Sequence, residues 1–135
     1  MAISIVELKK ALDSLDEAII LASAREKVNE VEFKLFRDAC IQRFEFCIEL
    51  SWKISAKLMG SSSTISKPVI REMAQNGLID DVPKWFSYID ARNKTSHSYD
   101  EDIAKSVYES AKSFMVDGKN LFARLAQFQG RPGGQ

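Results

Sequence analysis

Three side chains in the C-terminal half of the chain combine a fixed cation, an amide and a titratable ring within six positions. They are Arg92, Asn93 and His97, and His97 is the single histidine of the chain. A guanidinium can hold a phosphate, an amide can orient a neighbouring group, and an imidazole titrates near neutral pH. If a helix continues through the segment, Asn93 and His97 stack one turn apart and Arg92 lies about 140° around the axis from His97. These residue types fit a metal-free site that cleaves phosphodiesters.

The same segment also has a purely structural interpretation. Arg92 can pair with a nearby aspartate such as Asp90, and His97 can cap a helix end or bond to backbone. A lone histidine plays such a part more often than it catalyses. The residue types by themselves leave both interpretations open.

Metal-free cleavage of RNA sets a requirement that one copy of the chain does not meet. One group must take the 2′-hydroxyl proton and another must protonate the leaving oxygen, yet the chain has one histidine. A symmetric dimer that brings two copies of the segment together supplies a second imidazole and a second arginine in one cleft. The chemistry therefore predicts a homodimer.

A second group of polar residues lies in a strongly helical stretch. Glu45, Glu49 and Lys53 recur every four residues, a spacing that places them on one helix face. An exposed ladder of ion pairs, each worth a few tenths of a kcal/mol, is the simpler interpretation of the group.

The remaining reactive side chains point to structure. Cys40 and Cys47 are seven residues apart in a helical stretch, about 10 Å along its axis, which is too far for a disulfide. With one histidine the chain lacks a complete zinc ligand set, so we expect buried thiols and no cofactor. No glycine-rich phosphate loop or paired acidic motif for two metals appears. Lys67 and Lys94 can steer a phosphate backbone or simply be solvated, and the aromatic residues, at helical spacing, are assigned to the core.

The charges of the chain limit the kinds of partner. The 19 basic and 19 acidic residues cancel, so no global positive field attracts nucleic acid and any RNA contact must be local. No run approaches the ~18 apolar residues of a membrane span, and residues 1–10 lack the pattern of a signal peptide. We therefore expect a cytoplasmic protein with no membrane contact.

Apolar residues at steps of three and four predict an all-α fold, an antiparallel bundle of four to five helices. The expected helices cover residues 5–25, 30–59, 66–75, 80–97 and 100–128. The length of 135 residues and the hydrophobic content of 45% predict one domain over residues 1–128, followed by a disordered tail at 129–135. Gly118 lies inside the last helix, where we expect it to loosen or kink the helix.

Residues 92–99, Arg-Asn-Lys-Thr-Ser-His-Ser-Tyr, resemble the motif of HEPN toxins. The motif is an arginine, four residues, a histidine, one residue and a tyrosine, and the asparagine directly after the arginine agrees as well. Residues 42–53, 69–72 and 77–81 are similar to the subfamily called nucleotidyltransferase substrate-binding proteins. The resemblance covers about residues 33–125, and the motif together with these flanking blocks carries it.

The resemblance implies a helical-bundle homodimer with the motif in a cleft between protomers, encoded beside a minimal nucleotidyltransferase. Arg92 and His97 would carry metal-independent RNA cleavage, and Asn93 would support the site. Tyr99 corresponds to the tyrosine to which the antitoxin nucleotidyltransferase transfers AMP, adding bulk and negative charge where an RNA phosphate should sit. The resemblance also makes Glu45 a supporting residue that orients Arg92 across the bundle.

The residues and the resemblance together allow three functions, of which the first is the leading hypothesis. The first is a metal-independent endoribonuclease toxin that is neutralised by AMP transfer to Tyr99. The second is a noncatalytic substrate-binding subunit that presents a substrate, or its own Tyr99, to a minimal nucleotidyltransferase. The third is a structural dimerisation domain in which Arg92 and His97 bond across the interface. A helical bundle serves all three, so the enzyme interpretation rests on the motif and its family.

Overall fold

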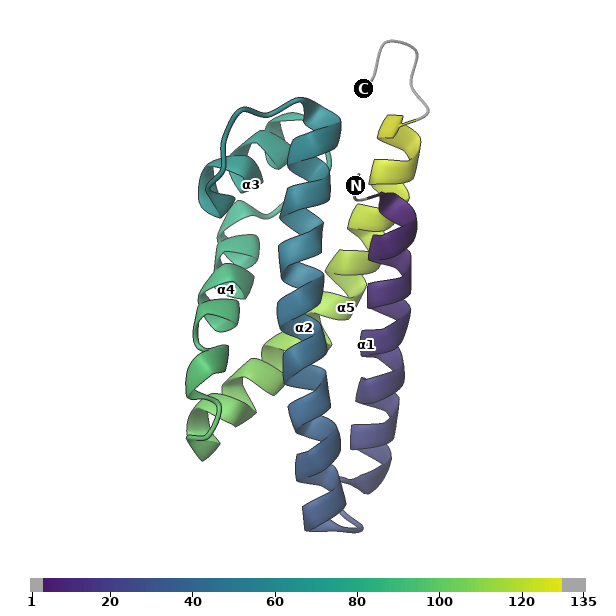
Figure 1. The fold of residues 1–135 in the computed structure, drawn as a ribbon, viewed down its shortest axis with the longest axis vertical. Helices are drawn as coiled ribbons and strands as arrows, with labels where there is room; N and C mark the ends of the chain where they lie inside the picture. The colour runs from purple at the N-terminus through teal and green to yellow at the C-terminus, as the bar shows by residue number, and fades with distance from the viewer. Residues whose placement is uncertain (1–3, 130–135) are drawn as a thin grey trace.

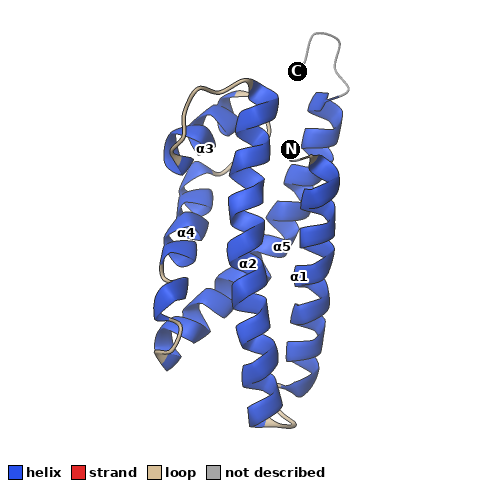
Figure 2. Cartoon of the chain, in the orientation of Figure 1, coloured by secondary structure: helices blue, strands red, loops and turns tan. Residues whose placement is uncertain are grey.

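Residues 4–129 are described by a computed structural model and contain only helices and their connections (Figure 2). The elements are α1 (Ile5–Arg25), α2 (Glu30–Met59), α3 (Ser66–Gln75), α4 (Val82–Asn93), the 3-10 helix η1 (Thr95–His97) and α5 (Glu101–Gln129). Helix α1 lies on one side of α2, and α3 and α4 lie on the other, whereas α5 crosses behind α2, so that its first turns lie near the end of α4 and its later turns lie beside α1 (Figure 1). The predicted all-α bundle is confirmed.

Local signals set the ends of the helices. The Asn29 side chain accepts a hydrogen bond from the Glu32 N–H at 3.0 Å and caps α2. Gly60 ends α2 with φ of 70°, a left-handed conformation that glycine adopts without a steric penalty. Asp81 caps α4 in the same way as Asn29 caps α2, because its carboxylate accepts the Lys84 N–H at 3.0 Å. The predicted bounds of the first three helices agree with α1, α2 and α3.

The fourth helix was expected to reach His97, and this expectation is wrong. α4 ends at Asn93, and a separate turn of 3-10 helix follows at Thr95–His97. The Thr95 hydroxyl donates to the Arg92 carbonyl at 2.8 Å, and short hydroxyl side chains of this kind compete with regular helical bonding. Asn93 and His97 therefore do not stack along one continuous α-helix.

Aromatic rings in the centre of the bundle hold α4 against the long helices. Phe114 of α5 meets Phe44 of α2, and Trp85 and Tyr88 of α4, edge-on at centroid distances of 5.4–5.7 Å. Such edge-to-face pairs add about 0.5–1.5 kcal/mol each beyond the burial of their area. The position of α4, which carries Arg92 at its end, is thus fixed by the core.

Gly118 does not interrupt α5, which is helical from Glu101 to Gln129. A Cβ atom at this position would lie 2.8 Å from Leu12 Cδ2 of α1 and 2.8 Å from Phe114 Cζ. The glycine therefore serves close packing of α5 against α1. The expectation that it loosens the helix missed this role.

The two cysteines are free and buried, as predicted. Burial raises the pKa of the Cys40 thiol to about 11 and that of the Cys47 thiol to about 12. Gln129, expected in the tail, is the last residue of α5, and residues 130–135 of that tail lie outside the described part of the chain. No helix within residues 4–129 is long and apolar enough to cross a membrane. The extent of the single domain stays a prediction.

Candidate functional site

Residues 92–99 form the connection that joins α4 to α5 at one end of the bundle (Figure 1). Arg92 and Asn93 are the last two residues of α4, His97 ends η1, and Tyr99 lies two residues before α5. Asp100 fixes the start of α5, because its carboxylate accepts the N–H groups of the next turn at 2.9 and 3.2 Å. The motif therefore begins in the last turn of α4, passes through η1 and ends just before the capped start of α5.

Arg92 reaches across the bundle to two carboxylates of α2. Its Nη2 lies 3.2 Å from Glu45 Oε2, and its Nε lies 3.3 Å from Glu49 Oε2. Trp52 Nε1 donates to the same Glu49 oxygen at 3.2 Å. Arg92 Nε is buried and, despite its short distance to Glu49, lacks the alignment of a hydrogen bond. The two glutamates hold the guanidinium by charge and leave part of its donor capacity unused.

Glu49 has a larger part here than the sequence suggested. The ladder interpretation describes its pair with Lys53, at 3.3 Å, but misses its contact with Arg92. Asp90, expected as a partner of Arg92, pairs instead with Lys67 at 3.1 Å. The four-residue spacing of Glu45 and Glu49 was the available signal, since it presents both carboxylates to the same neighbour.

His97 and Tyr99 lie at the surface of the connection. Tyr99 is 86% exposed, and its ring centroid is 6.1 Å from that of His97 at an interplanar angle of 68°. The backbone of His97 is fixed, because its N–H donates to Lys94 and its carbonyl accepts from Asp100. Within residues 4–129 its ring makes no hydrogen bond or ion pair, so the imidazole is uncommitted on a fixed backbone.

A second ion pair fastens the other side of the connection to α2. Arg37 Nη1 lies 2.5 Å from Glu101 Oε2, and Nη2 lies 3.2 Å from Oε1. The Arg37 side chain is 5% exposed, and its hydrogen bonds hold the pKa of Glu101 below the ordinary value. Helix α2 thus binds both flanks of the motif. Two carboxylates of α2 contact Arg92 at the end of α4, and a guanidinium of α2 contacts Glu101 at the start of α5.

Neither Arg37 nor Glu101 was singled out from the sequence. A signal was available, because Arg37 falls on the apolar face of α2 at helical spacing from Phe33, Cys40 and Phe44. A charge in such a position is buried only when it is paired. The partner, 64 residues away, is not visible in a local pattern.

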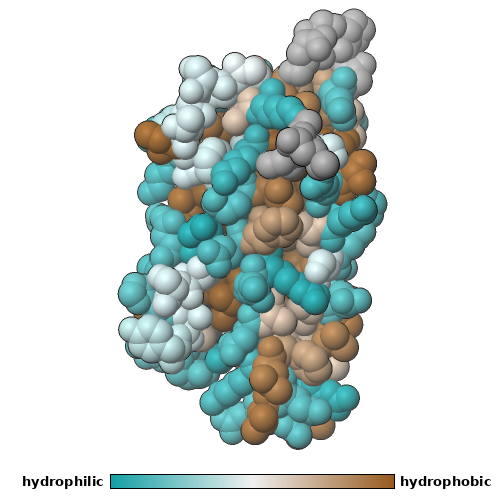
Figure 3. Space-filling model, in the orientation of Figure 1, coloured by the Kyte–Doolittle hydropathy of each residue, from teal (hydrophilic) through white to brown (hydrophobic). Residues whose placement is uncertain are grey.

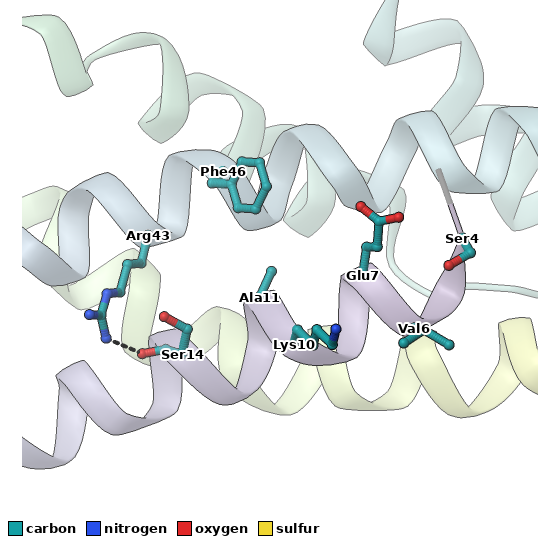
Figure 4. A pocket seen from close by; sticks show the side chains of 8 residues that line it. All are labelled: Ser4, Val6, Glu7, Lys10, Ala11, Ser14, Arg43 and Phe46. Carbon is teal, nitrogen blue, oxygen red and sulfur yellow. Dashed lines mark hydrogen bonds between the residues drawn. The ribbon is translucent and has the colours of Figure 1, made fainter. Parts of the chain in front are cut away.

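A groove of ≈ 450 Å³ lies away from the motif, between α1 and α2 (Figure 4). It is lined by Ser4, Val6, Glu7, Lys10, Ala11, Ser14, Arg43 and Phe46. None of the motif residues lines it. Within residues 4–129 no cluster of three or more histidine, cysteine or acidic side chains is placed to hold a metal ion.

Known proteins resemble the chain in sequence and in fold. A solved structure from Haemophilus influenzae, described as the fold of a substrate binding domain of a nucleotidyltransferase, superposes with a TM-score of 0.80 at 31% identity, covering 91% of this chain and 99% of that one. A structure from Thermus thermophilus gives 0.74 at 30% identity, covering 87% and 98%. The Haemophilus influenzae protein named "Probable ribonuclease HepT" is 33% identical over 132 residues, 89% of this chain and 90% of that protein. Residues 4–127 match the family model described as nucleotidyltransferase substrate binding protein like.

Proposed function

Because the chain belongs to the nucleotidyltransferase substrate-binding protein family, we propose that it is a HEPN toxin, a cytoplasmic, metal-independent endoribonuclease. Its partner is a minimal nucleotidyltransferase, the antitoxin, which silences it by transferring AMP to Tyr99. One observation carries the proposal. The guanidinium of Arg92, at the end of α4, is followed five residues later by the exposed and uncommitted imidazole of His97.

The proposed reaction is an internal transfer at an RNA phosphate. The 2′-hydroxyl oxygen attacks the adjacent phosphorus, the bond from phosphorus to the 5′-oxygen breaks, and a 2′,3′-cyclic phosphate and a 5′-hydroxyl result. His97 acts as acid or base on one of the two protons that move. Arg92 holds the phosphate oxygens, and Glu45 keeps the guanidinium in place. Asn93, exposed beside Arg92, supports the site.

A second copy of the chain supplies the other proton-transfer group. Exposed apolar residues lie on α2 toward its N-terminal end from Glu45, where Val31 and Leu35 share one helix face at a spacing of four residues. Leu35 is 64% and Val31 71% exposed. In Figure 3, brown hydrophobic side chains lie among teal hydrophilic ones at the lower end of the molecule. We place the homodimer contact along this face, so that two motifs share one cleft.

The exposure of Tyr99 supports its role as the modified residue. Its ring is accessible to a partner enzyme and lies beside the His97 ring. An adenylate on the Tyr99 hydroxyl would bring negative charge and bulk to the position where the RNA phosphate must bind. Modification would therefore block the site without any change in the bundle.

A noncatalytic subunit of the nucleotidyltransferase is the second candidate. The contact of Arg92 with two glutamates favours it, because the pair of carboxylates offsets the cation that a phosphate would need. In this alternative the exposed Tyr99 is presented to the nucleotidyltransferase as a docking or acceptor residue. The two candidates differ in whether the purified chain cuts RNA.

The deciding experiment is RNA cleavage by the purified chain in the presence of a chelator. We expect cleavage by the wild type and by Tyr99→Phe, and none by His97→Ala. Ser96→Ala, an exposed neighbour, is the matched control and should cleave. Circular dichroism should show the same helix content in every variant.

Two outcomes would count against the enzyme. Undiminished cleavage by His97→Ala would remove the catalytic assignment. An absence of cleavage by every protein, with the mass of an unmodified Tyr99 confirmed, would favour the noncatalytic subunit.

A further inference from the structure

Two cations of α3 lie over one aromatic ring of α4. Lys67 Nζ is 5.4 Å and Arg71 Cζ is 5.1 Å from the centroid of the Phe86 ring. Asp90, one turn further along α4, binds the same lysine at 3.1 Å. We call Lys67, Arg71 and Phe86 the cation patch. Its members are held by defined contacts rather than free in solvent.

The cation patch lies on the same face of α4 as part of the motif. Phe86, Asp90 and Asn93 are separated by four and then three residues, the spacing of one helix face. Phe86 is therefore about 10 Å along the helix from Asn93, or two turns. A chain lying along this face of α4 would pass from the motif to the cation patch.

The charges of the patch do not cancel. Lys67 shares its charge with Asp90, whose side chain is 56% exposed. Arg71 makes no ion pair within residues 4–129, and its described contact is with the Phe86 ring. The patch therefore keeps a net positive charge on a protein whose total charge is zero. Any attraction for a polyanion is concentrated at such places.

The arrangement of the two cations fits successive phosphates. Lys67 and Arg71 are one turn apart on α3, about 6 Å along its axis, which is comparable to the separation of neighbouring phosphates in a single strand. Phe86 restrains both side chains, so less side-chain freedom is lost when they bind an anion. The ring faces the cations, so it positions them and is not left free for a base.

We propose that the cation patch is a phosphate-binding subsite for single-stranded RNA whose scissile bond lies at His97. This inference rests on the proposed ribonuclease function and adds to it the residues that hold the substrate outside the reacting bond. The strand follows the outer face of α4, and Lys67 and Arg71 each neutralise one backbone phosphate. An acidic surface of a protein partner is the alternative occupant that the test must separate.

The test compares a dinucleotide, which spans only the scissile bond, with a longer single-stranded RNA of about ten nucleotides. The double variant Lys67→Ala/Arg71→Ala should cleave the dinucleotide at the wild-type rate. For the longer RNA its KM should rise about tenfold or more with unchanged kcat, because two phosphate contacts are lost. Lys27→Ala/Lys119→Ala removes the same charge from other surfaces and should leave both substrates unaffected.

A salt titration of RNA binding keeps the inference testable even if the chain does not cleave RNA. Fluorescence anisotropy of the longer RNA on the His97→Ala background should give a plot of log affinity against log salt that is less steep by about 1.4 for the double variant. Phe86→Leu, which keeps the apolar volume, should lose part of the affinity. An unchanged KM together with an unchanged salt slope would overturn the subsite. Loss of nucleotidyltransferase binding with unaltered RNA binding would assign the patch to a protein partner and also overturn it.

Discussion

The contact between α1 and α5 can be tested at Gly118, where a single added methyl group meets two buried side chains. In Gly118→Ala the new Cβ would lie 2.8 Å from Leu12 Cδ2 and 2.8 Å from Phe114 Cζ, whereas carbon atoms in favourable contact are about 3.5–4.0 Å apart. Leu12 is 3% exposed and Phe114 is fully buried. The Phe114 ring is also held by three other aromatic rings. Neither neighbour can move aside into solvent.

Two effects of opposite sign decide the result of Gly118→Ala. Alanine favours an α-helix over glycine by about 1 kcal/mol. Forcing an extra methyl group into a packed core costs about 1–3 kcal/mol. The packing cost is larger, so the free energy of unfolding should fall by about 1 kcal/mol and Tm by roughly 3–5 °C.

Urea denaturation followed by circular dichroism measures this change, and a second background tests its cause. Leu12→Ala removes one of the two side chains that the new Cβ would meet and leaves space into which the Phe114 ring can shift away from it. In that background Gly118→Ala should be neutral or stabilising, which corresponds to a coupling of about 1 kcal/mol between the two sites. Stabilisation of the otherwise wild-type chain by Gly118→Ala would refute the close contact between α1 and α5.

Three further predictions concern buried and charged groups. Tyr88→Phe removes the hydroxyl that donates to Asp117, so the urea midpoint should fall by the equivalent of about 1 kcal/mol, and an unchanged midpoint would mean that the bond adds nothing. Burial raises the thiol pKa of Cys40 and Cys47 to about 11 and about 12, so a disulfide reagent at about pH 8 should modify neither until denaturant is added. Hydrogen bonding lowers the pKa of Asp80, so its stabilising effect is present above the unfolded pKa and is lost as pH falls through the folded pKa. Asp80→Asn should therefore be less stable than the wild type at about pH 7 and equal to it in strong acid, as thermal melts at both pH values would show.

The helices could be predicted because their signals are local. The apolar periodicity, the Asn29 cap and the left-handed Gly60 lie within a few residues of the boundaries that they set. The end of α4 was misplaced because the sequence pattern that predicts a helix continues past Asn93. In the structure the Thr95 hydroxyl donates a hydrogen bond to the Arg92 carbonyl, and a 3-10 turn begins there. A threonine hydroxyl can form a hydrogen bond with solvent or with a carbonyl of its own helix, and the sequence does not tell which of the two it forms.

The residues of the candidate site are close together in the sequence, but the side chains that contact them are not. Arg92 and His97 are five positions apart in the chain, so a local sequence pattern was enough to single them out. The contact of Arg92 with Glu49 and that of Arg37 with Glu101 join residues far apart in sequence. Such pairs depend on how each helix is rotated about its axis relative to its neighbours. Apolar periodicity tells which face of a helix is buried and which is exposed, but it does not tell which residues of two helices meet.

The double attachment of the motif to α2 also bears on how members of this family can diverge. The anchors are Arg92 before the connection and Glu101 after it, whereas the side chains of Lys94, Ser96 and His97 between them are exposed. Substitutions in that interval touch little of the core, so each should change the free energy of unfolding by no more than about 0.5 kcal/mol. A chain that lacks His97 should therefore fold as the wild type does. The bundle and the exposed surface of the connection can therefore change in sequence independently of each other.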